Sequence, residues 1–302
     1  MDLKSKIILI SGPTASGKSS FAIKLAKKIK GEIINADSMQ VYKQLKILSA
    51  RPDPKNYQSI KHHLYGFQDA KKNFSTGEWL KIANKKIIEV KKRKNIPILV
   101  GGTGLYFKAL TDGLVKIPNI PIRFRNQIRN LNKTIGQNKF YKQLLKLDPL
   151  SKNKINPTDT QRSIRAFEVK KFTNKSLHEW FQNTTASYKE GDFFKIYIEY
   201  PRDELVAKIY QRTDEMIKMG AVKEIKRFLK LKIRKQMTAR KAIGIDEIRQ
   251  YLENKKKIDE IKEIISIKTR QYAKRQSTWA RGHMSSWNRF KPSELNKFLK
   301  KI

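Results

Sequence analysis

The stretch Gly12-Pro13-Thr14-Ala15-Ser16-Gly17-Lys18-Ser19 decides the fold, because it matches the pattern G-x-x-x-x-G-K-[ST] of a phosphate-binding loop. An apolar run at residues 7–10 (IILI) precedes the loop and predicts a buried strand. Apolar residues between Phe21 and Ile29 follow the loop at helical spacing. This order predicts an α/β fold, with a P-loop NTPase-like parallel sheet flanked by helices.

The residue types of this loop suit a phosphorylated ligand. Gly12 and Gly17 allow backbone N–H groups to face a phosphate, and the following helix adds partial positive charge. Lys18 supplies a point charge, and Ser19 offers a hydroxyl to Mg²⁺, the cofactor that we expect here. The candidate cofactor-binding residues are Gly12, Pro13, Thr14, Ala15, Ser16, Gly17, Lys18 and Ser19. The loop predicts a di- or triphosphate without choosing between them, and the alternative is a glycine turn before an ordinary helix.

The charge balance of the chain points to an anionic partner. Its 302 residues include 67 Lys and Arg against 27 Asp and Glu, a formal net charge of +40. Nucleic acid is the simplest soluble partner for such a charge, although a general composition bias would also raise it. The absence of cysteine excludes disulfides, thiolate metal sites and cysteine nucleophiles. Because no apolar run is long enough to span a bilayer, we expect a cytoplasmic protein. We also expect it to be a monomer.

Two further strand ends are expected beside the loop. Residues 32–35 predict a strand that leads to Asp37, and residues 96–100 predict one that leads into the glycines of 101–106. In an open α/β sheet such ends face the ligand crevice. Asp37 is therefore a candidate general base, or a ligand of Mg²⁺ through water. The alternative is a cap of a helix containing Met39 and Val41.

The middle of the chain has a different texture. Pro118 and Pro121 interrupt the pattern, and residues 114–191 are basic and helical in pattern. The sheet resumes at residues 193–200, so we expect a discontinuous catalytic core, 1–113 and 192–302, around an inserted helical domain, 114–191. A helix beginning near residue 160 carries Gln161, Arg162 and Arg165 on its polar face, and residues 261–279 form a basic helix. Both faces suit phosphate contacts, or simply solvent.

Seven segments together resemble one known family, the tRNA dimethylallyltransferases, which are also called tRNA isopentenyltransferases. They cover most of the chain and occur in the family's order. The segments are 12–19 (GPTASGKS), 36–42 (ADSMQVY), 101–106 (GGTGLY), 159–166 (DTQRSIRA), 211–212 (QR), 241–244 (KAIG) and 269–276 (TRQYAKRQ). The runs at 43–45 and 48–51 depart from the family's usual glycine-containing sequence, which leaves the edge of the substrate channel open to question.

This resemblance implies a reaction and roles for individual residues. Dimethylallyl diphosphate would donate its prenyl group to the adenosine on the 3′ side of the anticodon, with the loop holding pyrophosphate instead of ATP. The implied catalytic residues are Asp37 as general base, Thr14 beside the diphosphate, and Lys18 and Arg212 on the leaving group. The residues implied to contact the tRNA anticodon stem-loop are Asp37, Ser38, Met39, Gln40, Thr103, Arg125, Gln161, Arg162, Ser163, Ile164 and Arg165.

Other functions use the same kind of loop. A P-loop small-molecule kinase would transfer phosphate from ATP, and an adenine-nucleotide prenyltransferase would modify a free nucleotide. A non-catalytic RNA-binding protein would bind RNA without forming a covalent product. The basic helices and the predicted insertion favour a macromolecular acceptor.

Overall fold

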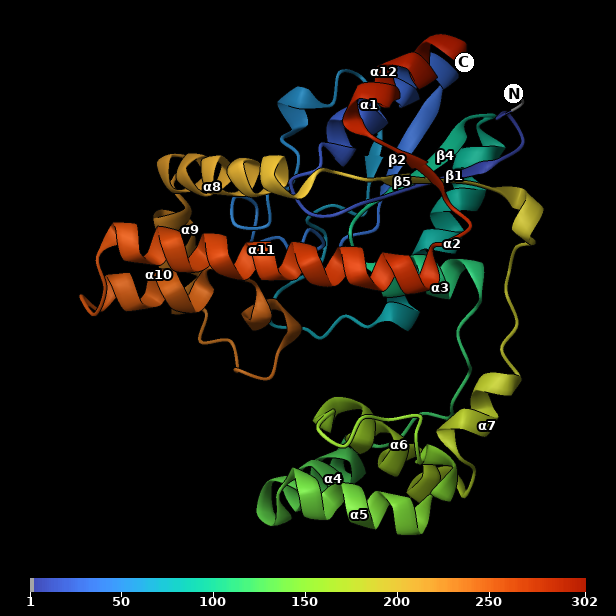
Figure 1. Ribbon diagram of the computed structural model, residues 1–302, viewed down its shortest axis with the longest axis vertical. Helices are drawn as coiled ribbons and strands as arrows, with labels where there is room; N and C mark the ends of the chain where they lie inside the picture. Colours follow the sequence, from blue (N-terminus) through green and yellow to red (C-terminus); the bar gives the residue numbers. More distant parts are fainter. Residues whose placement is uncertain (1–2) are drawn as a thin grey trace. The chain divides into compact units, whose positions relative to one another are not determined.

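A computed structural model describes residues 3–302 of the chain (Figure 1). The chain forms two compact units. One contains the described residues up to Thr111 together with Tyr188–Ile302, and the other contains Asp112–Ser187. The first unit is therefore discontinuous in sequence, because the second is inserted between two of its strands.

Within residues 3–302, the first unit is built on one six-stranded sheet in the order β3-β2-β4-β1-β5-β6. The strands are β1 (Ile7–Ser11), β2 (Gly31–Asn35), β3 (His62–His63), β4 (Ile96–Val100), β5 (Phe193–Ile198) and β6 (Asn288–Phe290). Every neighbouring pair is parallel. The parallel α/β prediction is thus confirmed.

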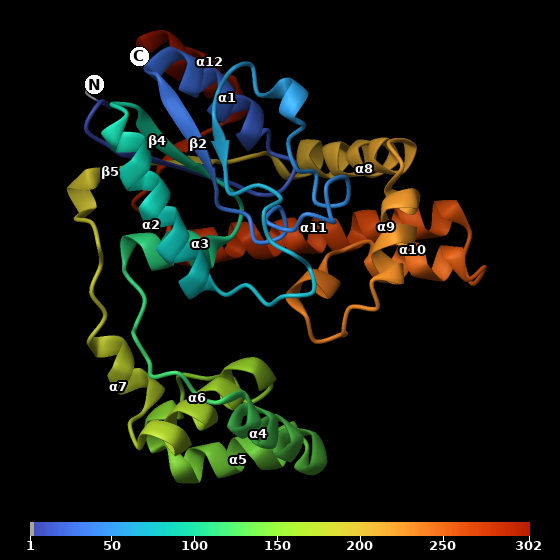
Figure 2. The ribbon, with the colours of Figure 1, turned by 180° about the vertical axis from the view of Figure 1, so that it is seen from behind.

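Helices cover both faces of this sheet (Figure 2). The α-helices of this unit are α1 (Lys18–Ile29), α2 (Thr76–Lys92), α3 (Gly104–Thr111), α8 (Arg202–Lys218), α9 (Ala221–Lys230), α10 (Ile245–Leu252), α11 (Ile258–His283) and α12 (Pro292–Lys301). Its short 3₁₀ helices are η1 (Pro54–Asn56), η3 (Glu190–Asp192) and η4 (Thr238–Lys241).

Alternation along β1 explains how one strand serves two cores. Ile7 and Leu9 pack with residues of α2 and α3, whereas Ile8 and Ile10 pack with residues of α1 and α12. Successive side chains of a strand point to opposite faces, so an unbroken apolar run is required where both faces are covered. This is why the strand could be predicted from residues 7–10.

Local signals fix several helix ends. Ser75 and Glu78 form a capping box at the start of α2. Pro201 precedes α8, and Gly220 then begins α9 with φ of +99°, a conformation that favours glycine. The basic helix expected at 261–279 is longer at both ends and forms α11.

The helical unit has its own hydrophobic core. Its helices are α4 (Ile122–Ile135), α5 (Gln137–Leu147), α6 (Thr160–Thr173) and α7 (Leu177–Gln182), with a 3₁₀ turn η2 (Pro149–Ser151). Phe140 and Leu144 of α5 and Ala166 and Val169 of α6 are fully buried in this core. An apolar stripe on each helix is what allows these elements to pack without a sheet.

Two strands and one turn differ from the expectations. The edge strands β3 and β6 were not predicted, because each has three residues or fewer and no alternating pattern. Residues 38–41 form a turn, so the helix considered after Asp37 is wrong. The turn forms because Asp37 Oδ1 accepts hydrogen bonds from the backbone N–H groups of Met39, at 2.8 Å, and Gln40, at 3.4 Å.

Candidate active site

One cavity of about 150 Å³ collects the predicted catalytic residues at the carboxyl ends of the parallel strands. Asp37 follows β2, Gly101 follows β4, and the phosphate-binding loop follows β1. The cavity is lined by Thr14, Ala15, Ser16, Gly17, Lys18, Ser19, Ser20, Asp37, Gln40, Ser49, Ala50, Val100, Gly101, Arg212 and Gln276. The four residues implied to be catalytic therefore meet in one place, although 198 positions separate Thr14 from Arg212.

The loop backbone is arranged to accept an anion. Gly17 has φ of +79° and stands at the N-terminus of α1, where backbone N–H groups have no intrahelical acceptor. The hydroxyl of Ser16 is buried and has no hydrogen-bond partner in the described part of the chain. Because buried polar atoms are normally satisfied, this hydroxyl indicates that a ligand completes the loop.

Two cations and one carboxylate set the charge of the cavity. Arg212 donates from Nη1 to Thr14 Oγ1 at 2.8 Å, and Lys18 donates from Nζ to the carbonyl of Pro13 at 2.6 Å. Burial lowers the pKa of Lys18 to about 8; the carboxylate of Asp37 opposes this shift, and Arg212 adds to it. Burial also lowers the pKa of Arg212. A bound anion would relieve the repulsion between these cations.

One carboxylate oxygen of Asp37 accepts hydrogen bonds from the protein, and the other does not. Oδ1 accepts the turn hydrogen bonds described above, and the Asp37 N–H donates to Asn35 Oδ1 at 2.9 Å. Within residues 3–302, Oδ2 has no hydrogen-bond partner. A carboxylate with a fixed orientation and one open oxygen in a ligand cavity is able to accept a proton.

The neighbours of Asp37 define the cavity edge. Thr103 Oγ1 accepts from the backbone N–H of Ser38 at 2.9 Å and donates to Ser38 Oγ at 3.3 Å. Gln40 Nε2 donates to the carbonyls of Ser49 and Ala50, both at 3.1 Å. The segment that departs from the family pattern is therefore tied to the predicted RNA-contacting turn, while Met39 packs on the sheet core.

Gln276 is a site residue that our sequence reasoning did not assign. Its Oε1 accepts from the backbone N–H of Thr14 at 2.8 Å, and its Nε2 donates to the carbonyl of Gly102 at 2.9 Å. It also lines a neighbouring cavity of about 290 Å³, together with Gly12, Thr103 and Trp279. Its presence in the quoted segment 269–276 was the only sequence signal, since the contact spans 262 positions.

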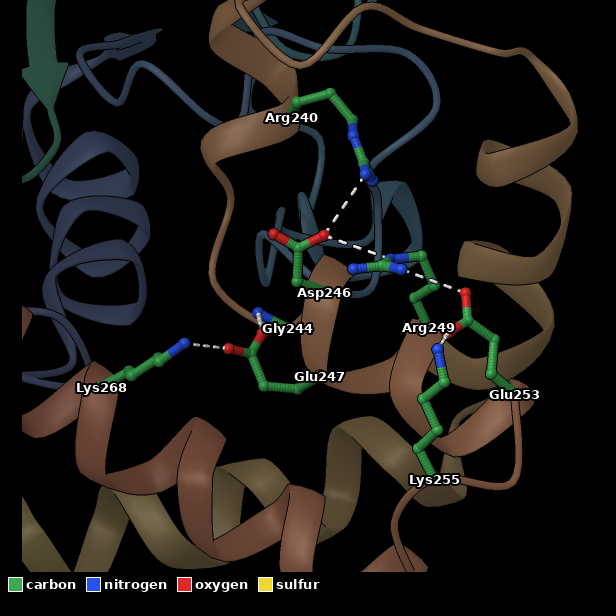
Figure 3. Close-up of polar contacts among 8 residues, drawn as sticks. All are labelled: Arg240, Gly244, Asp246, Glu247, Arg249, Glu253, Lys255 and Lys268. Atoms are coloured by element: carbon green, nitrogen blue, oxygen red, sulfur yellow. Dashed lines mark hydrogen bonds and ion pairs between the residues drawn. The ribbon is translucent and has the colours of Figure 1, made fainter.

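A cluster around α10 holds the segment at 241–244 in place (Figure 3). Glu247 accepts from the backbone N–H of Gly244 at 2.9 Å and forms an ion pair with Lys268 of α11. Asp246 pairs with Arg240 at 3.3 Å and with Arg249 at 3.4 Å. The pair of Glu247 and Lys268 joins α10 to α11, the helix that carries Gln276, and the pair of Asp246 and Arg240 joins α10 to η4.

The remaining predicted RNA contacts lie within the helical unit. Arg125 and Arg165 both contact the buried carboxylate of Glu168, and Arg162 is exposed beside Asp159. Gln161 is exposed at the first turn of α6. Ser163 is fully buried, and its hydroxyl donates to the Asp159 carbonyl at 2.7 Å, so its side chain is directed to its own helix. Ile164 is partly buried and packs against the unit's core.

Most ligands of a bound Mg²⁺ would come from the diphosphate substrate and from water. In the described residues, no cluster of three or more His, Cys, Asp or Glu side chains could hold a metal ion. Ser19 and Asp37 nevertheless place hard oxygen donors in the same cavity. A few protein oxygens together with diphosphate oxygens and water is the arrangement that Mg²⁺ prefers, so these residues fit the ion.

Comparisons with known proteins identify the family of this chain. The model of the family described as IPP transferase matches residues 40–283. A tRNA dimethylallyltransferase of Pelagibacter ubique is 59% identical over 302 residues, which cover 100% of this chain and 96% of that protein. A tRNA dimethylallyltransferase of Rickettsia massiliae is 46% identical over 279 residues, which cover 91% of this chain and 76% of that protein.

Solved structures give the same result. The tRNA isopentenylpyrophosphate transferase of Bacillus halodurans has a TM-score of 0.70 and 29% identity, covering 99% of this chain and 95% of that one. A eukaryotic dimethylallyltransferase acting on tRNA has a TM-score of 0.81 and 28% identity, covering 95% of this chain and 73% of that one. Among residues 3–302, no helix combines the length and the apolar character that crossing a bilayer requires. On the extent of the family match and the identity to these relatives, the chain belongs to the IPP transferase family.

Proposed function

We propose that this chain transfers the dimethylallyl group of dimethylallyl diphosphate to the exocyclic amine of the adenosine on the 3′ side of a tRNA anticodon. The observation that carries the proposal is the single cavity that joins an anion-binding loop, two cations and an open carboxylate. A kinase site would use a similar loop, but the family and the activities for which its relatives are named favour prenyl transfer.

The reaction requires one bond to form and one to break. The adenine nitrogen attacks the first carbon of the dimethylallyl group, the bond from that carbon to the bridging oxygen breaks, and pyrophosphate leaves. Positive charge on the allylic carbon is shared over the prenyl group, while negative charge grows on the departing oxygen. The site therefore has to stabilise a leaving anion more strongly than the bound substrate.

The cavity provides this stabilisation from several directions. N–H groups of the loop and the hydroxyl of Ser16 face the anion, and Lys18 and Arg212 neutralise its charge. Arg212 also orients the hydroxyl of Thr14 through their 2.8 Å hydrogen bond. Bound Mg²⁺, held by Ser19 and diphosphate oxygens, would supply further charge neutralisation.

Asp37 completes the reaction by taking the proton that the amine loses. Its Oδ2 is the open oxygen in the cavity, and its Oδ1 is fixed by the turn at residues 38–41. The amine of adenine is a weak nucleophile because its lone pair is shared with the ring, so removing this proton assists the attack. The target base has to leave the anticodon-loop stack to reach this cavity.

The acceptor distinguishes the possible activities. The purified chain is incubated with dimethylallyl diphosphate labelled in the prenyl group and with either tRNA or AMP. We expect label in tRNA and little in AMP. Label in AMP alone would identify an adenine-nucleotide prenyltransferase, whereas phosphate transfer from γ-labelled ATP to a small acceptor, without use of the prenyl donor, would identify a kinase. RNA binding with no labelled product would leave only a binding function.

A further inference from the structure

The helical unit contains one buried carboxylate that contacts three arginines. Glu168 of α6 has a side chain only 1% exposed. Its Oε2 lies 3.2 Å from Nε of Arg125 and 3.5 Å from Nη1 of Arg165, and its Oε1 lies 3.7 Å from Nε of Arg129. Arg125 and Arg129 belong to α4, so the carboxylate joins two helices of this unit.

The charge of this cluster is not balanced internally. One carboxylate offsets one guanidinium, so Glu168 leaves an excess of two positive charges within its immediate surroundings. The arginine side chains are 36%, 41% and 39% exposed, and each directs only one nitrogen toward Glu168. In the described part of the chain, their other guanidinium nitrogens donate to no protein acceptor. The cluster therefore presents N–H donors that no protein acceptor uses; Arg125 and Arg165 are hydrogen-bonded to Glu168, whereas Arg129 is held by an ion pair at 3.7 Å, beyond hydrogen-bond distance.

Guanidinium groups arranged in this way suit phosphate oxygens. The planar fork of arginine binds phosphate with two parallel hydrogen bonds, and holding the side chain in place beforehand reduces the entropy lost on binding. The buried Glu168 carboxylate restrains these arginine side chains, and the guanidinium nitrogens that do not contact it are left for phosphate oxygens. One arginine is enough to neutralise this carboxylate, so the positive charge of the other two is left for an external anion.

We infer that Glu168 is a positioning residue that holds Arg125, Arg129 and Arg165 for the phosphate backbone of the RNA substrate, and that Arg129 is a further RNA-contacting residue. This inference rests on the proposed function for its ligand. Arg129 was not among the residues implied by the sequence resemblance, and only its contact with Glu168 brings it into the cluster.

The first test compares two arginines of α4. Arg129→Gln removes a cluster member, whereas Arg123→Gln removes an exposed arginine that forms no ion pair in the described structure. Arg123 lies about 200° around the helix from Arg125, while Arg129 is one turn away on the same face. The readouts are tRNA affinity over a salt series, KM for tRNA and KM for dimethylallyl diphosphate.

We expect Arg129→Gln to weaken tRNA binding about tenfold and to reduce the slope of log K against log salt by up to about 0.7–0.9. Arg123→Gln should change affinity by less than about twofold. Neither variant should alter KM for dimethylallyl diphosphate. Equal effects of the two substitutions on tRNA binding would overturn the inference, because the loss would then follow charge alone.

The second test uses the sign of the effect. Glu168→Gln keeps the shape of the side chain and raises the net charge by one, so charge alone predicts tighter tRNA binding. Loss of positioning predicts weaker binding, by about tenfold, at unchanged kcat with saturating tRNA. Tighter binding would contradict the positioning role.

A folding control and the wild-type chain complete the design. Thermal melting shows whether Glu168→Gln is folded, and if it is not, the Arg129 and Arg123 pair still decides the question. Wild-type protein that fails to prenylate tRNA would remove the proposed function. Wild-type protein that prenylates tRNA, while Arg129→Gln behaves like Arg123→Gln, would overturn this inference only.

Discussion

At the scale of single residues, the proposed reaction depends on a carboxylate oxygen of Asp37 that forms no hydrogen bond within the described residues. Oδ1 is engaged by the backbone of the following turn, whereas Oδ2 has no hydrogen-bond partner among residues 3–302, and Asp37 lines the cavity. A residue that served only to cap a turn would not need to face the phosphate-binding loop. Lys18 and Arg212 line the same cavity, and their two positive charges exceed the one negative charge of Asp37.

Asp37→Asn removes the proposed base while keeping a side-chain oxygen for the turn. We expect single-turnover prenyl transfer to slow by about 10²–10⁴-fold, because a neutral amide does not accept the proton, with tRNA affinity nearly unchanged. Asp53→Asn is the matched control, since it removes a carboxylate that pairs with Lys46 outside the cavity. A near-normal rate for Asp37→Asn would exclude the base role.

Lys18 gives the site a pH dependence of known sign. With a pKa of about 8, the Lys18 amine is charged below pH 8 and becomes neutral above it. Its attraction for the diphosphate is therefore present below pH 8 and lost above it, so KM for dimethylallyl diphosphate should rise by up to about tenfold per pH unit above pH 8. Lys18→Arg stays charged throughout and should show no such rise in steady-state kinetics between pH 8 and 10. The assignment would be refuted by identical pH profiles.

At the scale of elements, side-chain contacts stabilise the short edge strand β3 against the rest of the sheet. His63 of β3 lies 2.6 Å from the carboxylate of Glu32 on β2, and Arg93 and Asn95, between α2 and β4, donate to the same carboxylate at 2.7 Å. Glu32 is nearly fully buried. One carboxylate thus joins an edge strand to the turn that starts the next strand.

The Glu32 cluster predicts an acid-sensitive contribution to stability. Burial alone would raise the pKa of Glu32, but hydrogen bonds from Arg93, Asn95 and His63 lower it from 4.5 to about 2. Its stabilisation is therefore complete above about pH 4.5 and disappears as pH falls toward 2.

Glu32→Gln should reduce the free energy of unfolding by about 2 kcal/mol at pH 7, allowing for solvent screening at Arg93, and by less at pH 3. Urea denaturation at the two pH values measures the difference. Glu89→Gln, which breaks the surface pair with Lys86, should leave the urea midpoint almost unchanged. An equal loss for Glu32→Gln at both pH values would rule out the ionised carboxylate as the cause.

At the scale of the whole molecule, the net charge of +40 predicts that salt affects the binding of the two substrates differently. tRNA binding by six to ten phosphate contacts would weaken by about 10³–10⁵-fold between 50 and 200 mM salt, because condensed counterions are released on binding. Dimethylallyl diphosphate enters a partly buried cavity, where screening is weaker, so its KM should change far less. Parallel titrations of both substrates over this salt range test the prediction. A nearly flat salt response for tRNA would show that the charge has no role in binding.

The sequence alone determined the features that depend on neighbouring residues. The strand, loop and helix around residues 12–19 follow from an apolar run, two glycines and a helical period. Asp37 could be placed near the loop because carboxyl ends of parallel strands meet at one edge. These inferences need only local geometry and one rule of sheet topology.

Only the tertiary structure decided which distant side chains meet. Gln276 reaches Thr14 across 262 positions, and Glu168 gathers Arg125 from a different helix, yet neither contact leaves a periodic trace in the sequence. The strands β3 and β6 form because a neighbouring strand offers hydrogen bonds to them. A segment of two or three residues is too short for its own sequence to predict such a pairing. Ser163 shows the converse, since membership of a recognisable segment did not determine which way its side chain points.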